Sequence, residues 1–237
     1  MLRNREDFEK LRPVKIIPDF IPNPLSSVLI ELGNTKVLIT VSLDDKVPPF
    51  LKGTGTGWIT VEYAFLPGAT KVRTPREVLQ RKGRSLEIQR MLGRVLRSVV
   101  DLTALGERTL WIDCDVLNAD GGTRSASATG AFVALKIAFK RLREQGVIER
   151  DPTIEYLAGI SVGKLGSDYL LDLNYEEDSM VEVDANFFMT ESGKIAEIQA
   201  SGEKSLFTWE ELEAMKNLAY KGIKELIQKQ KEVIGEE

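Results

Sequence analysis

Apolar residues in the first part of the chain recur mainly at every second position, which is the spacing of strands with one buried face. Residues 28–32 and 36–43 form two such runs, and Gly33-Asn34-Thr35 between them predicts a hairpin. A glycine-rich loop follows at 53–57, and the alternation at 58–65 predicts a further strand. Sheet structure is therefore expected to dominate this part of the chain.

Helical periodicity begins at Ser85, where the apolar positions recur every three or four residues. An apolar strand is predicted at 109–117, and a long helix is expected to begin within the small residues 125–129. A last helix starts at Thr208, because Thr208 and Glu211 have the spacing of a capping box.

The second part of the chain repeats this order of strands before a helix. Further strands are predicted at 158–165, 169–173, 180–189 and 195–200. Strands gathered before helices, twice over, predict an α+β fold of two related halves. We expect a single domain over residues 1–237, with halves at approximately 11–145 and 154–230 and a frayed tail at 231–237.

Composition excludes several kinds of chemistry. The 237 residues include no histidine, which removes imidazole bases and the commonest transition-metal ligand. The only cysteine, Cys114, falls in the apolar strand and is expected to be a buried thiol. No apolar run approaches the roughly 18 residues of a membrane span, and the N-terminus lacks a secretory pattern. A cytoplasmic protein without a membrane partner is expected.

Basic residues are concentrated in one tract although the net charge is -4. Nine lie between positions 71 and 97, against Glu77 and Glu87: Lys71, Arg73, Arg76, Arg81, Lys82, Arg84, Arg90, Arg94 and Arg97. Such an excess favours a polyanionic partner. The last three share one side of the predicted helix and are interpreted as a solvated or subunit-facing stripe, whereas Arg84 is expected just outside the helix, where it can reach an anion.

The turn Gly121-Gly122-Thr123-Arg124 joins the apolar strand to the long helix. Glycines allow a tight turn, and the start of a helix offers unpaired amides and partial positive charge. With a hydroxyl from Thr123 and a guanidinium from Arg124, the turn predicts a phosphate site. An ordinary strand-to-helix connection is the alternative.

Acidic residues gather at 172–184, between two predicted strands. Asp178 at the turn and Asp184 in the next strand are expected to approach each other, and such a carboxylate pair favours a hard cation such as Mg²⁺. Glu176 and Glu177 are interpreted as residues of a solvated acidic loop.

Several motifs together resemble the ribonuclease PH family of bacterial phosphate-dependent exoribonucleases, which trim tRNA 3′ ends. The resemblance extends from about Leu11 to the final helix and rests on these segments: Gly83-Arg84-Ser85-Leu86-Glu87-Ile88-Gln89-Arg90, Asp113-Cys114-Asp115-Val116, Ala119-Asp120-Gly121-Gly122-Thr123-Arg124 and Asp172-Leu173-Asn174-Tyr175-Glu176-Glu177-Asp178. It implies a ribosomal protein S5 domain 2-like fold and a homohexameric ring, a trimer of dimers.

The resemblance also implies roles for individual residues. Arg84, Gly122, Thr123 and Arg124 would hold the attacking inorganic phosphate, and Asp178 and Asp184 would serve a metal, Mg²⁺ or Mn²⁺, and proton transfer. Asp178 or a metal-held water would protonate the leaving oxygen. Lys71, Arg73 and Arg76 would guide RNA, chiefly tRNA precursors with 3′ extensions. Nucleoside diphosphates would be released, and the reverse reaction, which adds nucleotides to RNA, would also be possible.

Two departures from the family pattern concern RNA affinity. The chain has Asn4-Arg5-Glu6 where members usually carry Asp-Gly-Arg, and Gly68 where many have arginine after Leu-Pro.

A non-catalytic RNA-binding ring subunit of the same fold is an alternative, although it should lack the cradle or the acidic pair. A nucleotide-binding kinase on an S5-like fold is another, and the absence of a Gly-Lys-Ser or Gly-Lys-Thr loop counts against it.

Overall fold

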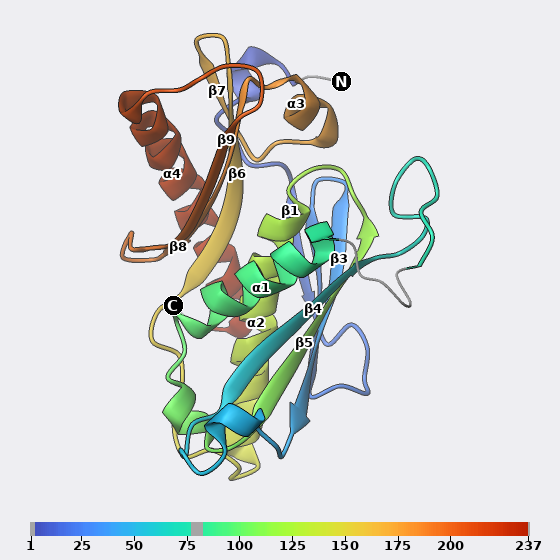
Figure 1. Cartoon of the computed structure of the whole chain (residues 1–237), viewed down its shortest axis with the longest axis vertical. Coiled ribbons are helices and arrows are strands. Elements are labelled where there is room, and N and C mark those ends of the chain that lie inside the picture. Colours follow the sequence, from blue (N-terminus) through green and yellow to red (C-terminus); the bar gives the residue numbers. More distant parts are fainter. Residues whose placement is uncertain (1–2, 77–82, 237) are drawn as a thin grey trace.

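A computed structural model describes residues 3–76 and 83–236 and shows two β-sheets with helices packed against them (Figure 1). The first sheet has the strand order β1-β2-β3-β5-β4. Its strands are β1 (Val14–Pro18), β2 (Ser26–Leu32), β3 (Thr35–Asp44), β4 (Trp58–Phe65) and β5 (Thr109–Asn118). The predicted hairpin is confirmed, since Leu32 pairs with Thr35 across the turn at Gly33 and Asn34.

The two strands β4 and β5 are parallel, unlike the other pairs of this sheet. Parallel neighbours need a crossover connection, and α1 (Gly83–Arg97) supplies it. The apolar stripe of α1 is buried as predicted, except at Leu86, which is exposed. The crossover brings the N-terminal end of α1 to the same end of the sheet as the start of α2 (Thr123–Glu144), so that residues of both helices line one cavity.

The second sheet is antiparallel, with the strand order β7-β6-β8-β9. Its strands are β6 (Leu157–Leu165), β7 (Asp168–Leu171), β8 (Val183–Thr190) and β9 (Ile195–Gly202). The short helix α3 (Tyr175–Met180) was not predicted, and β8 begins at Val183 rather than at Met180. Asn174 and Glu177 form a capping box that starts α3, which is the physical reason for the difference.

Helix α2 lies at the centre of the molecule and packs against strands of both sheets (Figure 1). It begins at Thr123, earlier than predicted, after Gly122 in the left-handed conformation. Most of its side chains are buried because it has protein on nearly every side. A Cβ at Gly130 would lie 2.7 Å from Cδ1 of Ile39, so β3 approaches the helix too closely for a larger residue.

The C-terminal helix α4 (Trp209–Ile234) begins with the predicted Thr208–Glu211 capping box, which is confirmed. The expectation of a frayed tail at 231–237 is wrong for the described residues. Gln230 is fully buried, Lys231 pairs with Glu191 at 2.9 Å, and Glu236 contacts Lys136 at 3.0 Å. Partners elsewhere in the fold hold this end of the chain, which its local composition does not reveal.

Short 3₁₀ helices complete the described structure: Arg5–Asp7, Pro49–Leu51 and Leu102–Leu105. The two sheets with their helices confirm the predicted α+β class. Within residues 3–76 and 83–236, no helix is both long and apolar enough to cross a bilayer.

Candidate active site

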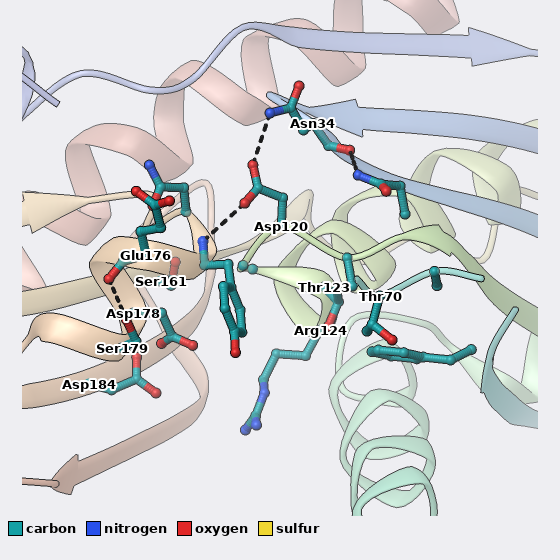
Figure 2. Close-up of a pocket in the computed structure, with 18 of the residues that line it drawn as sticks. Asn34, Thr70, Asp120, Thr123, Arg124, Ser161, Glu176, Asp178, Ser179 and Asp184 are labelled. Carbon is teal, nitrogen blue, oxygen red and sulfur yellow. Dashed lines mark hydrogen bonds between the residues drawn. The ribbon is translucent and has the colours of Figure 1, made fainter. Parts of the chain in front are cut away.

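A cavity of about 1270 Å³ brings together residues from both halves of the chain. Seven of the nine predicted site residues line it: Lys71, Arg84, Gly122, Thr123, Arg124, Asp178 and Asp184. Figure 2 shows Asp178 and Asp184 on one side of this pocket, and Thr123 and Arg124 from the start of α2 on the other. The turn, the first long helix and the acidic tract therefore share one site.

The glycine turn has the backbone shape expected of an anion cradle. Gly121 and Gly122 have φ angles of 75° and 66°, a region that glycine adopts without steric cost. Helix α2 starts immediately afterwards, and the amides of a helix's first turn have no acceptor within the helix. The turn thus directs partial positive charge into the cavity.

Thr123 is oriented by a partner that the sequence analysis missed. The hydroxyl of Tyr63 donates to Oγ1 of Thr123 at 2.8 Å. Burial raises the pKa of Tyr63 to about 12, so its hydroxyl stays protonated at neutral pH. Because Oγ1 of Thr123 already accepts this bond, its own proton is available for an anion in the cavity. The inward position of Tyr63 in the alternation of β4 was the only sequence signal for this contact.

The two arginines of the site come from the first turns of different helices. Arg124 is the second residue of α2, and its guanidinium donates to Oε1 of Gln199 and lies 3.9 Å from Oε1 of Glu87. Arg84 is exposed and lies within α1, so its expected place outside the helix is wrong. It still lines the cavity, because the start of α1 faces the cradle.

The acidic pair occupies the other side of the cavity. Burial raises the pKa of Asp184 to about 6, and the nearby charge of Asp178 contributes to the shift. Burial also raises the pKa of Asp178, while the positive charges of Arg84 and Arg124 act in the opposite direction. These mutual effects place the carboxylates within electrostatic reach of each other and of the arginines.

The carboxylates suit a hard divalent cation. Oδ1 of Asp184 is buried without a hydrogen-bond partner, while its Oδ2 receives a long hydrogen bond of 3.4 Å from Asn186. An unpaired buried carboxylate oxygen beside a second carboxylate is a site where positive charge is favourable. Oxygen ligands of this kind are those that Mg²⁺ binds, usually through one or two carboxylates with water completing the shell.

Two other acidic residues of the tract have structural partners. Glu177 is buried and accepts from Nε of Arg3 at 2.8 Å, so the expectation that it belongs to a solvated loop is wrong. Glu182 pairs with Nζ of Lys164 at 3.5 Å. Neither is among the described residues that line the cavity.

The basic tract divides into three parts. Lys71 lines the cavity, whereas Arg73 and Arg76 lie exposed in the segment after β4 and do not line it. Arg81 and Lys82 lie outside the described residues.

The expected solvated stripe on α1 is only partly present. Arg90 is exposed, and Arg94 pairs with Glu197 at 3.0 Å. Arg97 instead lies over the Trp58 ring, 4.1 Å from its centroid, and donates to the carbonyl of Ile59. Arg97 therefore packs between α1 and β4.

The cavity also contains residues that sequence reasoning did not identify. They include one exposed aromatic side chain, several polar groups and a lysine: Tyr175, Asn34, Ser161, Asn186, Glu203 and Lys204. Each is an ordinary residue of a loop, a strand or the start of α3, so only proximity in space marks it.

Comparisons with known proteins agree over most of the chain. Residues 10–140 match the model of the 3′ exoribonuclease family, domain 1, and residues 155–222 match that of domain 2. The chain is 56% identical to ribonuclease PH of Bacillus velezensis over 239 aligned positions, covering 100% of this chain and 98% of the relative. It is 54% identical to ribonuclease PH of Bacillus subtilis, again covering 100% and 98%.

Solved structures show the same fold at lower identity. The Archaeoglobus fulgidus exosome with RNA bound to the active site has a chain with a TM-score of 0.80 and 23% identity, covering 94% of this chain and 89% of that one. Rice Rrp46 has a TM-score of 0.78 and 18% identity, covering 98% of both chains.

Proposed function

Because the chain belongs to the 3′ exoribonuclease family, we propose that it is a phosphate-dependent exoribonuclease that shortens the 3′ end of tRNA. In this reaction an oxygen of inorganic phosphate attacks the phosphorus of the terminal phosphodiester. The bond to the 3′ oxygen of the shortened RNA breaks, and a nucleoside diphosphate is released. The enzyme is thus a nucleotidyltransferase whose acceptor is phosphate.

One observation carries this proposal: the glycine turn, two arginines and two aspartates from distant parts of the chain line the same cavity. A phosphorolytic site must bring an anionic nucleophile to an anionic substrate, so it must supply positive charge. Arg84, Arg124, Thr123 and the α2 amides hold the attacking phosphate. No protein nucleophile is required, which agrees with a chain that has no histidine.

Asp178 and Asp184, on the side of the cavity opposite the phosphate cradle, would hold Mg²⁺, or Mn²⁺ in its place. The cation supplies positive charge to the scissile phosphate when it is bound. The leaving 3′ oxygen must acquire a proton. Asp178, whose pKa is raised by burial, or a water held by the cation would supply that proton.

RNA enters beside Lys71, with Arg73 and Arg76 on the same segment guiding its backbone. The exposed ring of Tyr175 in the cavity offers a surface on which a base can stack.

The protein works as a homohexamer, a trimer of dimers, in the cytoplasm where tRNA is processed. An RNA-binding ring subunit without activity is not favoured, since this chain keeps both the cradle and the acidic pair.

A short RNA labelled at its 3′ end tests the reaction. Incubation with inorganic phosphate and Mg²⁺ is expected to release labelled nucleoside diphosphates, and omission of phosphate is expected to stop release. Release of nucleoside monophosphates that is independent of phosphate would indicate a hydrolase. No release from RNA under either condition would favour the non-catalytic subunit.

A further inference from the structure

The phosphate cradle rests on a buried ion pair that does not reach the cavity. Arg12 and Asp172 have side chains that are 6% and 1% exposed. Nη2 and Nε of Arg12 donate to the two carboxylate oxygens of Asp172 at 2.7 and 3.0 Å, and the backbone amide of Arg12 adds a third bond at 3.0 Å. Among the described residues that line the cavity, neither of the two is found.

The same guanidinium also holds the cradle. Nη1 of Arg12 donates to the carbonyl of Asp120 at 2.6 Å, and a Cβ at Gly122 would lie 3.1 Å from Nη2. Arg12 is therefore packed directly beneath the turn that carries Thr123 and Arg124. Its fork of donors spans the Asp172 carboxylate and the cradle backbone at once.

Asp172 begins the segment that leads to the acidic helix. Its backbone has a φ of 56°, a left-handed conformation that is uncommon outside glycine, asparagine and aspartate. Leu173 and Asn174 connect it to α3, which carries Asp178. Fixing the Asp172 carboxylate therefore fixes the point from which α3 starts.

The cradle and the start of α3 are also in direct contact. A Cβ at Gly121 would lie 2.3 Å from the carbonyl oxygen of Leu173 and 2.6 Å from the carbonyl carbon of Asn174. The amide of Tyr175 donates to Oδ1 of Asp120 at 3.3 Å. A movement of either segment must displace the other, because no space separates them.

We infer that Arg12 and Asp172 are positioning residues for phosphorolysis, which set the phosphate cradle against the acidic helix by bonding to both. The inference rests on the proposed function and deepens it. Arg12 touches no substrate. It acts through the Asp120–Gly122 backbone and through Asp172, so it determines how well the cradle fits phosphate.

Arg12→Lys tests the inference in the full-length protein with Mg²⁺. Lysine keeps the positive charge but cannot donate to Asp172 and to the Asp120 carbonyl with one planar group. We expect the KM for phosphate to rise about tenfold while the KM for RNA stays within about twofold, since small displacements of catalytic groups cost large factors. Titration of inorganic phosphate by calorimetry is expected to show the same weakening without turnover.

A matched control lies elsewhere in the chain. Arg141 donates to Oδ1 of Asp19 at 2.6 Å and to the carbonyl of Leu25 at 2.8 Å, and Asp19 also has a left-handed φ, 54°. This is a similar arrangement with a single bond to the carboxylate; it is more exposed, and neither residue is among the described residues that line the cavity. Arg141→Lys is expected to leave both KM values unchanged.

Asp172→Asn replaces the first variant if Arg12→Lys does not fold, because asparagine tolerates the left-handed backbone. A folded variant of either kind with wild-type phosphate binding and wild-type kinetics would overturn the inference. A lower kcat with unchanged phosphate KM and binding would also overturn it, because a smaller fraction of folded enzyme gives the same result without any change at the cradle. Failure of the wild type to release diphosphates would reject the proposed function, while calorimetry would still report on Arg12.

Discussion

Arg84 and Arg124 bring positive charge to the cavity from the starts of two helices. Each arginine reaches the cavity for a different structural reason. Arg124 ends the contiguous segment Gly121-Gly122-Thr123-Arg124, so the cradle motif itself identified it. Arg84 depends on the crossover that brings the start of α1 to the cavity. Both charges act on Asp178, which shows that they share one electrostatic environment.

Replacing Arg84 by alanine is expected to weaken phosphate use and leave the fold intact, because its side chain is exposed in the first turn of α1. Loss of one charge contact made in the transition state costs on the order of 3 kcal/mol, about a hundredfold in rate. Steady-state titration with phosphate measures the effect. Arg90→Ala on the same helix is the control, and an unchanged phosphate KM in Arg84→Ala would remove Arg84 from the site.

Asp178→Asn is expected to bind RNA normally and to lose turnover by about a hundredfold, because an amide cannot supply the negative charge that holds a cation. RNA binding by fluorescence anisotropy and phosphorolysis rates separate the two effects. Glu182→Gln, in the same acidic tract but paired with Lys164, serves as the control. Near-normal turnover in Asp178→Asn would contradict the role of Asp178.

Asp184 makes the stability of the protein depend on pH when divalent cations are absent. Its pKa is raised from 3.8 to about 6 in the folded state, so the folded protein binds this proton more tightly than the unfolded chain. The carboxylate therefore destabilises the fold above about pH 6, and this cost disappears as pH falls from 6 to 3.8. Two pKa units correspond to about 3 kcal/mol at most.

Asp184→Asn is expected to unfold at a higher temperature than wild type at pH 8, with the difference vanishing near pH 4. Thermal unfolding in a chelating buffer measures this. Mg²⁺ at pH 8 is expected to stabilise the wild type more than the variant. A variant that is no more stable than wild type at pH 8 would show that the Asp184 carboxylate carries no such cost.

At the scale of elements, the long periodic segments were predictable and the short α3 helix was not. The alternation of β4 gave its bounds as 58–65, which the structure confirms. Helix α3 spans only six residues, fewer than two turns, so it has no periodicity that can be recognised. Its Asn174 cap was the one local signal.

The end of α4 provides a stability prediction at this scale. Nε2 of Gln230 donates to the carbonyls of Thr129 and Leu157 at 3.0 and 2.9 Å, within the buried contact of α4 with α2 and β6. Gln230→Ala removes both of these buried hydrogen bonds and is expected to cost about 2 kcal/mol. Gln228→Ala, exposed on the same helix, is the control. Equal unfolding midpoints in urea for the two variants would contradict the structural role of the helix end.

At the scale of the whole molecule, several large apolar side chains remain exposed in the single chain. Leu206 is 94% exposed and Trp209 81%, three residues apart where α4 begins. A group of exposed apolar side chains commonly marks a surface that is covered on assembly.

We expect the purified protein to form a homohexamer, because assembly covers such surfaces. Light scattering coupled to size-exclusion chromatography is expected to give a mass six times that of one chain, with dimers appearing on dilution. A mass equal to one chain at micromolar concentration would contradict the ring.

The sequence by itself determined the class of fold, most strands and long helices, and the chemical types at the site. These follow from local regularities: side-chain periodicity, the Gly-Gly turn, the capping box at Thr208 and the absence of histidine. The residues proposed to bind an anion and a cation could be named because the turn and the acidic tract are each contiguous.

Only the tertiary structure decided how these segments meet. The hydroxyl of Tyr63 on Thr123, the buried Arg12–Asp172 pair and the ordered end of α4 join residues far apart in the chain. Such contacts depend on the packing of two sheets around α2, and no local pattern encodes which distant group arrives at a given side chain. The same packing raises the pKa of Asp184, because burial is a property of the surroundings and not of the residue.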